Sequence, residues 1–230
     1  MDMKVKICGI TNRNDLKKIE KLDYDRVGFI NIERSKRNVS INRINQLERE
    51  LNYKRSSTLV IEPDNAYDVI LKSNRLKIYN IQLHSLNSFD IRYIKWINQY
   101  HNFENINITR AIGLKDKIDK SKKRELIDFS TKCDNILLDY VKDGLTGGTN
   151  TQIPIDTAIE ASKIIKKANN HTEVSLAGGL NYEYLESIYD ELKYFDRIDL
   201  NSGVEFEPGC KNINEIKKIL KLFNNWLERW

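Results

Sequence analysis

The sequence predicts a single α/β domain, a closed (β/α)8 or TIM barrel that uses residues 1–230. Short apolar runs alternate with longer stretches of helical period, and no Pro- or Gly-rich linker divides them. This alternation is typical of parallel strands joined by crossover helices. The chain also opens and closes on similar segments, in which an apolar strand runs into small or reactive residues: Lys4-Val-Lys-Ile-Cys-Gly-Ile-Thr11 and Asp199-Leu-Asn-Ser-Gly-Val-Glu205.

Eight short runs are predicted to be strands. Most are continuously apolar, as expected for parallel strands that are covered on both faces. In chain order they are Val5–Cys8, Arg26–Ile30, Thr58–Ile61, Asn80–Leu83, Ile106–Ile112, Asn135–Leu138, Glu173–Leu176 and Arg197–Leu200.

Helices are predicted between these strands. Ser40 is a suitable N-cap, because apolar residues follow it at helical spacing. Further helices are predicted after a cap at Asp64, after Ser88, with Pro154 in the first turn, after a cap at Asn181, and from Asn212 to Trp230. The crossover over residues 113–134 is highly charged and gives the weakest helical pattern.

Two other architectures were weighed against the single barrel. Two small domains fit the length, but no linker separates them. A doubly wound open sheet needs a Gly-rich dinucleotide turn after the first strand, and Cys8-Gly-Ile-Thr11 is not one.

Composition narrows the range of functions. The mean hydropathy is −0.57, and no apolar run approaches the roughly 18 residues of a membrane span. The first predicted strand begins at once, which leaves no room for a signal peptide. The three cysteines form no CxxC pair, so we expect a cytoplasmic protein with reduced thiols. The net charge of +5 is mild and lacks basic runs with interleaved aromatics, so we expect no nucleic-acid partner. A basic rim that attracts phosphorylated metabolites explains the charge equally well.

In a parallel barrel, reactive side chains gather at the carboxyl ends of the strands. Cys8 ends the first strand, and Asp139 follows the sixth. Cys8 is either a small buried apolar residue or a thiolate base or nucleophile, and the second role requires an electropositive rim that lowers its pKa. Asp139 is either a helix cap or ion-pair partner, or a proton donor whose pKa is raised by a partly dry pocket.

Two more side chains at strand ends are candidates for substrate binding. Arg37 follows the second strand and is either a solvated residue or a fixed cation whose planar fork binds an oxyanion in bidentate fashion. His84 ends the fourth strand and either polarises a substrate or caps a loop. The sequence contains no metal-ligand cluster, P-loop or Ser/His/Asp signature, so we expect no metal.

Glycines cluster after the sixth, seventh and eighth strands. Residues without side chains let backbone N–H groups approach an anion, as a phosphate site requires, although tight turns also use glycine. The pairs after the last strands lie where barrels often bind phosphate. The candidates are Gly148, Gly178, Gly179, Ser202 and Gly203.

Taken in order, these strand endings resemble those of the phosphoribosylanthranilate isomerase family, single-barrel enzymes of tryptophan biosynthesis. The resemblance extends over nearly the whole chain. It rests on Lys6-Ile-Cys-Gly-Ile-Thr11, Val27-Gly-Phe29, Ser35-Lys-Arg37, Gln82-Leu-His84, Leu137-Leu-Asp139, Gly147-Gly-Thr149, Leu176-Ala-Gly-Gly-Leu180, Asp199-Leu-Asn-Ser-Gly-Val-Glu205 and Pro208-Gly209.

The resemblance implies an Amadori rearrangement of N-(5-phosphoribosyl)anthranilate, without a cofactor. Asp139 would be the general acid that opens the furanose ring, and Cys8 the general base that takes a proton from the adjacent sugar carbon. Arg37 would hold the anthranilate carboxylate, Asp199 would lie near the ribose hydroxyls, and the glycines with Ser202 would bind the phosphate. The enzyme would act as a monomer or homodimer on a small phosphorylated molecule.

Two departures from the family pattern concern the substrate more than the fold. Asn150 replaces the last glycine of the loop over residues 147–154, and an aromatic residue is missing there. Asn31-Ile-Glu33 stands where an apolar or aromatic stretch is more usual. The alternatives are therefore a barrel enzyme acting on another phosphosugar and a non-catalytic binding member of the lineage.

Overall fold

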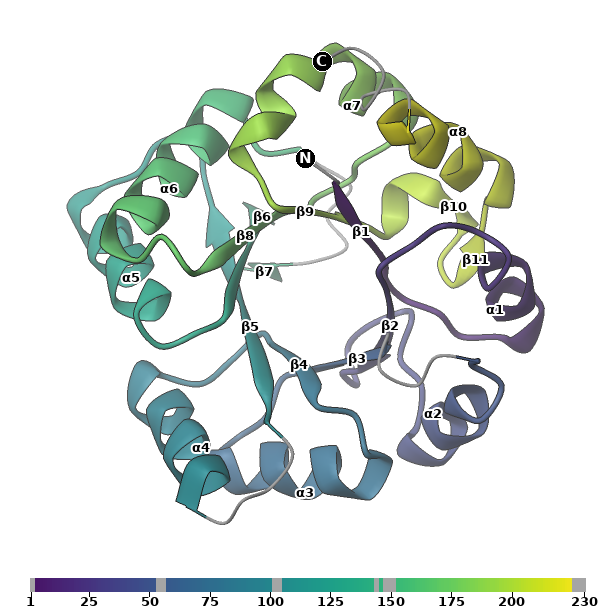
Figure 1. Ribbon diagram of the computed structural model, residues 1–230, viewed down its shortest axis with the longest axis horizontal. Coiled ribbons are helices and arrows are strands. Elements are labelled where there is room, and N and C mark those ends of the chain that lie inside the picture. The colour runs from purple at the N-terminus through teal and green to yellow at the C-terminus, as the bar shows by residue number, and fades with distance from the viewer. Residues whose placement is uncertain (1–2, 53–56, 101–104, 143–144, 147–151, 225–230) are drawn as a thin grey trace.

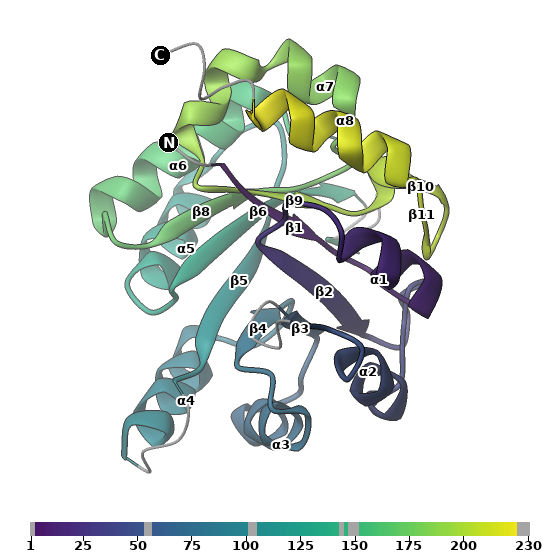
Figure 2. The same ribbon diagram turned by 45° about the vertical axis from the view of Figure 1, so that its right-hand side comes forward.

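The computed structural model describes residues 3–52, 57–100, 105–142, 145–146 and 152–224. Parallel strands close into a barrel with the hydrogen-bonded order β5-β4-β3-β2-β1-β9-β8-β6, and pairing of β5 with β6 completes the ring. Helices surround this ring on its outside (Figure 1), and the strands are inclined to the barrel axis (Figure 2). The predicted (β/α)8 barrel is confirmed.

All the predicted strands form; most of their ends lie within two residues of the prediction, and the sixth strand runs four residues further, to Lys142. The barrel strands are β1 (Lys4–Ile7), β2 (Arg26–Asn31), β3 (Ser57–Ile61), β4 (Asn80–Leu83), β5 (Asn107–Leu114), β6 (Asn135–Lys142), β8 (Glu173–Leu176) and β9 (Arg197–Leu200). A short β7 (Leu145–Thr146) pairs antiparallel with β6, and β10 (Glu205–Glu207) forms a hairpin with β11 (Cys210–Lys211).

The helices of the outer layer follow the strands in alternation. They are α1 (Arg13–Ile19), α2 (Ile41–Glu48), α3 (Ala66–Leu76), α4 (Ser88–Tyr100), α5 (Lys120–Ser130), α6 (Ile155–Ala168), α7 (Tyr182–Ser187) and α8 (Ile213–Asn224). Two 3₁₀ segments, η2 (Tyr189–Tyr194) and η3 (Ser202–Val204), flank β9.

The helix caps test the predicted boundaries. Ser40 and Asn181 accept hydrogen bonds from backbone N–H groups in the first turns of α2 and α7, as predicted. The predicted cap at Asp64 is wrong, because Asn65 caps α3 by accepting from the backbone N–H of Asp68 at 3.0 Å. Pro154 occupies the N-cap position of α6 rather than its first turn.

The charged crossover between β5 and β6 contains α5. Asp119 caps this helix by accepting from the backbone N–H of Lys122 at 2.7 Å. Leu126 and Phe129 are buried against the barrel, while most other positions are polar. This narrow apolar face explains why the sequence pattern was weak here.

The barrel is closed by the two ends of the chain. β1 pairs in parallel with β9 from Lys4 opposite Arg197 to Ile7 opposite Leu200. At the amino ends of the strands, Arg197 is buried and donates to Asp25 and Glu173, both at 2.9 Å. These ion pairs tie down one end of the barrel, and the opposite end carries the cavity described below.

In the described part of the chain, no helix is both long enough and apolar enough to cross a bilayer.

Candidate active site

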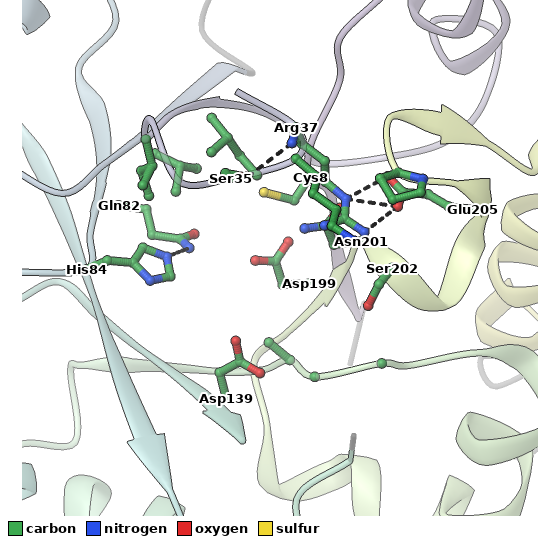
Figure 3. Close-up of a pocket in the computed structure, with 18 of the residues that line it drawn as sticks. Cys8, Ser35, Arg37, Gln82, His84, Asp139, Asp199, Asn201, Ser202 and Glu205 are labelled. Atoms are coloured by element: carbon green, nitrogen blue, oxygen red, sulfur yellow. Dashed lines mark hydrogen bonds and ion pairs between the residues drawn. The ribbon is translucent and has the colours of Figure 1, made fainter. Parts of the chain in front are cut away.

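A cavity of about 600 Å³ opens at the carboxyl ends of the barrel strands (Figure 3). Seven of the barrel strands contribute side chains to it at or near their ends, which is why residues far apart in sequence meet there. The predicted site residues that line the cavity are Cys8, Arg37, His84, Asp139, Gly178, Gly179, Asp199 and Ser202. Gly148 lies outside the described residues.

Gly203, a predicted phosphate-binding residue, is not among the residues that line the cavity, but it is next to Ser202, which is. A Cβ atom at this position would lie 2.1 Å from the carbonyl oxygen of Leu180 and 2.8 Å from the carbonyl carbon of Gly179. The glycine therefore lets the segment after β9 pack directly on the segment after β8. This close packing helps to position Gly179 and Ser202, which line the cavity.

Cys8 and Asp139 lie on different sides of the cavity, with Asp199 between them in the view of Figure 3. β8 and β9 separate the two strands that carry them. Cys8 packs in a small apolar cluster with Ile30, Ile32 and Val60. Asp139 is also buried, and its Oδ1 accepts a hydrogen bond from the backbone N–H of Tyr140 at 2.8 Å.

The lowered pKa that a thiolate role for Cys8 would require is not what the surroundings of the thiol produce. Burial raises the pKa of the Cys8 thiol, and the negative charge of Asp199 raises it further. The positive charges of Lys6 and Lys211 oppose this shift without cancelling it. At neutral pH the resting residue is therefore a thiol.

A chain of polar contacts crosses the floor of the cavity from Lys6 to His84. Lys6 Nζ donates to Gln82 Oε1 at 2.7 Å, and Gln82 Nε2 lies 3.0 Å from His84 Nε2 (Figure 3). Because an ammonium only donates, the amide oxygen must face Lys6 and the amide N–H must face the imidazole. His84 Nε2 is then an acceptor, which makes the ring neutral with its proton on Nδ1.

We expect His84 to stay neutral across the physiological range. Its pKa is lowered to about 4 by burial, followed by the positive charges of Lys6 and Arg110. The unfolded state therefore binds more protons between about pH 6.5 and 4, so the free energy of unfolding should fall as the pH drops through this window.

The ¹⁵N shifts of the imidazole rings measure this directly, since the chain has only three histidines. His84 should show a protonated Nδ1 and a bare Nε2 at pH 7 and should titrate near pH 4. A midpoint near 6.5 would contradict the lowered pKa, and a protonated Nε2 at pH 7 would contradict the deduced tautomer. His84→Gln assigns the signal.

Arg37 is buried, so the alternative of a solvated surface residue is wrong. Its Nε and Nη2 donate to the Glu205 carboxylate at 2.8 and 2.6 Å (Figure 3). Lys211 Nζ, fully buried, donates to the same carboxylate at 2.7 Å. Two cations thus share one anion. The fork of Arg37 that was expected to bind a substrate oxyanion is occupied by Glu205 through Nε and Nη2.

Asp199 lines the cavity and has one carboxylate oxygen that lacks a partner among the described residues. Its Oδ2 accepts from Lys6 Nζ at 2.7 Å, while Oδ1 is buried without a hydrogen-bond partner among the described residues. A buried carboxylate oxygen in this state is costly unless a donor reaches it. Such an oxygen at the cavity wall is suited to accept from a ligand hydroxyl.

The two ends of the cavity differ in chemistry. One end combines the apolar side chains of Ile30, Ile32 and Val60 with the cations Arg34 and Arg37. The other end is formed by small residues, which expose backbone to a ligand: Ala177, Gly178, Gly179 and Ser202. Cys8, Asp139 and Asp199 line the same cavity. Among the described residues, no three or more metal-ligating side chains form a group that could hold a metal ion.

A sequence model of N-(5'-phosphoribosyl)anthranilate (PRA) isomerase matches residues 5–222. The chain belongs to the N-(5'-phosphoribosyl)anthranilate isomerase family. It is accordingly an enzyme, an isomerase of tryptophan biosynthesis, as the sequence resemblance implied.

Individual members of the family cover nearly the whole chain. The N-(5'-phosphoribosyl)anthranilate isomerase of Methanothermobacter thermautotrophicus is 32% identical over 211 residues, 92% of this chain and 84% of that protein. The isomerase of a Sulfurihydrogenibium species is 26% identical and covers 97% of this chain and 100% of its own length.

Solved structures of the family share the fold. Phosphoribosyl anthranilate isomerase from Thermotoga maritima superposes with a TM-score of 0.78 at 23% identity, covering 97% of this chain and 99% of that one. A phosphoribosyl anthranilate isomerase in complex with reduced 1-(o-carboxyphenylamino)-1-deoxyribulose 5-phosphate has a TM-score of 0.75 at 22% identity and the same coverage.

The segments that depart from the family pattern still contribute to the site. Ile32, in the altered stretch after β2, is buried and lines the cavity. Gln152, in the altered loop before α6, donates through Nε2 to the carbonyl oxygen of Gly179 at 3.0 Å. This contact connects the altered loop to the glycine-rich end of the cavity, while Asn150 lies outside the described residues.

Three buried residues of the site were not predicted as such from the sequence. Lys6 and Gln82 form the polar floor, and Glu205 holds Arg37. The position of Lys6 could have been deduced from its spacing to Cys8, because residues two apart on a strand face the same side of the sheet. Glu205 carried no comparable signal, since its partner lies 168 positions away.

Proposed function

We propose that this cavity rearranges N-(5'-phosphoribosyl)anthranilate to 1-(2-carboxyphenylamino)-1-deoxyribulose 5-phosphate by general acid–base catalysis, with Asp139 as the acid and Cys8 as the base. The observation that carries the proposal is the cavity's asymmetry. An apolar, cationic end suits an aromatic carboxylate, and a glycine-rich end suits a phosphate. The two titratable groups belong to the same cavity, where a ribose bridging its ends would lie.

The reaction begins with proton donation. Asp139 protonates the furanose ring oxygen, the bond from that oxygen to the anomeric carbon breaks, and the amino nitrogen's lone pair forms a Schiff base. The position of Asp139 favours this role, because its carboxyl group is held at the cavity wall, where a bound sugar ring would lie.

Proton removal follows at the neighbouring carbon. The Cys8 thiolate takes the proton from C2, the electron pair moves to the Schiff base, and an enolamine results, which tautomerises to the ketose product. Asp199 Oδ1 accepts a hydrogen bond from a ribose hydroxyl, and this contact supplies the partner that the oxygen lacks among the described residues. His84 stays neutral and contributes a ring N–H through Nδ1.

Binding at the two ends fixes the substrate across the acid and the base. Arg37 Nη1 binds the anthranilate carboxylate, and the Glu205 and Lys211 contacts hold the guanidinium in place. Backbone N–H groups near Gly178 and Gly179, with the hydroxyl of Ser202, bind the phosphate. Gly148 belongs to the same phosphate proposal by its place in the sequence.

The wider context also remains a proposal. The substrate is a small phosphorylated molecule, and no nucleic acid takes part. The sparse, unpaired cysteines of the sequence support a cytoplasmic location. One relative, the enzyme of Thermotoga maritima, is dimeric, and this chain acts as a monomer or a homodimer.

The test is turnover by the wild-type protein. Anthranilate fluorescence should disappear when the enzyme meets freshly generated N-(5'-phosphoribosyl)anthranilate, with a kcat of about 1 to 10³ per second. The product should have the substrate's mass, and a sample without enzyme corrects for spontaneous hydrolysis. A folded wild type without turnover would contradict the proposal and would favour another phosphosugar as substrate.

A further inference from the structure

Lys6 is a buried lysine to which the mechanism above gives no role. It lies on β1 two residues before Cys8, so both side chains project from the same face of the strand into the barrel. Its side chain is only 4% exposed. Lys6 Nζ donates to Asp199 Oδ2 and to Gln82 Oε1, each at 2.7 Å, so β9 and β4 hold the ammonium from two sides.

The thiol of Cys8 and the stem of Lys6 share one packing surface. A Cβ atom at Gly28, on the neighbouring strand β2, would come within 2.7 Å of Cys8 Sγ and 3.1 Å of Lys6 Cε. Both side chains therefore lie against the same bare backbone. The two groups also act on each other electrostatically: the charge of Lys6 opposes the rise in the pKa of Cys8, and Cys8 helps to raise the pKa of Lys6.

Two buried ammonium groups, those of Lys6 and Lys211, act on Cys8, and Lys6 has the larger effect on the pKa of the thiol. The β2 and β3 sides are apolar, with Ile30, Ile32 and Val60. β4 contributes neutral Gln82 and neutral His84. The charged groups are Lys6, the Asp199 carboxylate, and Lys211, which is committed to Glu205 and Asn201.

We propose that Lys6 is a positioning residue, the counter-ion that stabilises the Cys8 thiolate during catalysis. The inference rests on the proposed role of Cys8 as the base. The thiol proton leaves to water in the cavity, and the thiolate that remains pairs with the Lys6 ammonium until it takes the substrate's C2 proton. Asp199 and Gln82 keep the ammonium at the sulfur.

The electrostatics agree with this arrangement. Burial by itself would lower the pKa of Lys6, but Asp199 and Cys8 outweigh it and the pKa is raised, so the ammonium persists at neutral pH. Without this charge, nothing on β1 would oppose the effect of burial on the thiol.

The test is the pH dependence of Cys8 alkylation by iodoacetamide in the full-length protein, followed peptide by peptide with mass spectrometry. In Lys6→Met the pH midpoint of alkylation should rise by at least about one unit. At any pH below both midpoints, Cys8 should then be alkylated about tenfold more slowly than in wild type. Lys6→Arg should stay close to wild type. The acid limb of the kcat/KM profile should shift in the same direction as the alkylation midpoint.

Lys4→Met is the matched control. Lys4 lies on the same strand and the same face, but its side chain is 46% exposed and pairs with Glu173 at the other end of the barrel. Its alkylation profile should match wild type. If Lys6→Met does not fold, Lys6→Gln takes its place, because it removes the charge but can still donate to Asp199.

The outcomes separate the two claims. If the pH midpoint of Cys8 alkylation is the same in wild type and in folded Lys6→Met or Lys6→Gln, the counter-ion role of Lys6 is overturned, even in an active enzyme. A shifted midpoint in a protein whose wild type does not isomerise N-(5'-phosphoribosyl)anthranilate would instead overturn the proposed function and leave the ion pair standing.

Discussion

Replacing Cys8 by serine is expected to lower kcat by about 10³-fold while the barrel remains folded. A positioned general base accelerates a reaction by a factor of about 10² to 10⁴, and a serine hydroxyl cannot take this role because it does not ionise at neutral pH. The exchange of sulfur for oxygen is small, and the Lys6 ammonium beside this position remains available to the new hydroxyl. Single-turnover fluorescence decay measures the rate, and circular dichroism checks the fold.

The chain supplies its own control for this variant. Cys133 is also buried, and burial, followed by the charge of Asp134, raises the pKa of its thiol to about 12. It packs in the main core rather than at the cavity, so Cys133→Ser should cost stability and leave kcat within about twofold. A Cys8→Ser enzyme that keeps a tenth of the wild-type kcat would show that Cys8 is not the base.

Replacing Asp139 by asparagine is expected to cost about 10² to 10⁴ in kcat. The amide oxygen of asparagine can accept the hydrogen bond from the Tyr140 backbone N–H as the carboxylate does. An amide is not an acid, however, so the furanose oxygen receives no proton and the ring does not open. Steady-state kinetics should show the loss in kcat rather than in KM.

Asp134→Asn is the matched comparison, at the opposite end of the same segment. The Asp134 carboxylate accepts from the backbone N–H of Ile108 at 2.7 Å and pairs with Lys95. Its replacement should lower the free energy of unfolding by about 1 to 3 kcal/mol in urea titrations and leave kcat close to wild type. Equal kinetic losses in both variants would remove the special role given to Asp139.

The strands could be predicted because parallel strands covered on both faces are continuous apolar runs. The helices were harder where few apolar residues face the barrel. In α5 the buried apolar residues are Leu126 and Phe129 alone. The remaining positions are mostly polar or charged, so the helical spacing of apolar residues is hard to see in the sequence. The cap of α3 was misplaced by one residue because Asp64 and Asn65 are both good caps, and only the backbone decides between them.

The site could be predicted as far as strand ends reveal it. Cys8, Asp139 and Asp199 stand where each strand stops, and barrel topology brings such residues together. The residues that tune them could not be predicted, because Lys6 and Glu205 depend on partners 193 and 168 positions away. The close packing of Gly203 against the Leu180 carbonyl could not be predicted either, because it depends on contacts that one sequence does not show.

The pairing of β1 with β9 has a consequence for the newly made chain. Lys6 and Asp199 are separated by 193 positions, which a ribosome covers in about 10 to 40 seconds at 5 to 20 residues per second. During that interval β1 lacks its second neighbour, and Lys6 lacks the carboxylate that holds it. The ion pair between Lys6 and Asp199 can therefore form only after the last strand of the barrel has been made, which ties completion of the site to completion of the barrel.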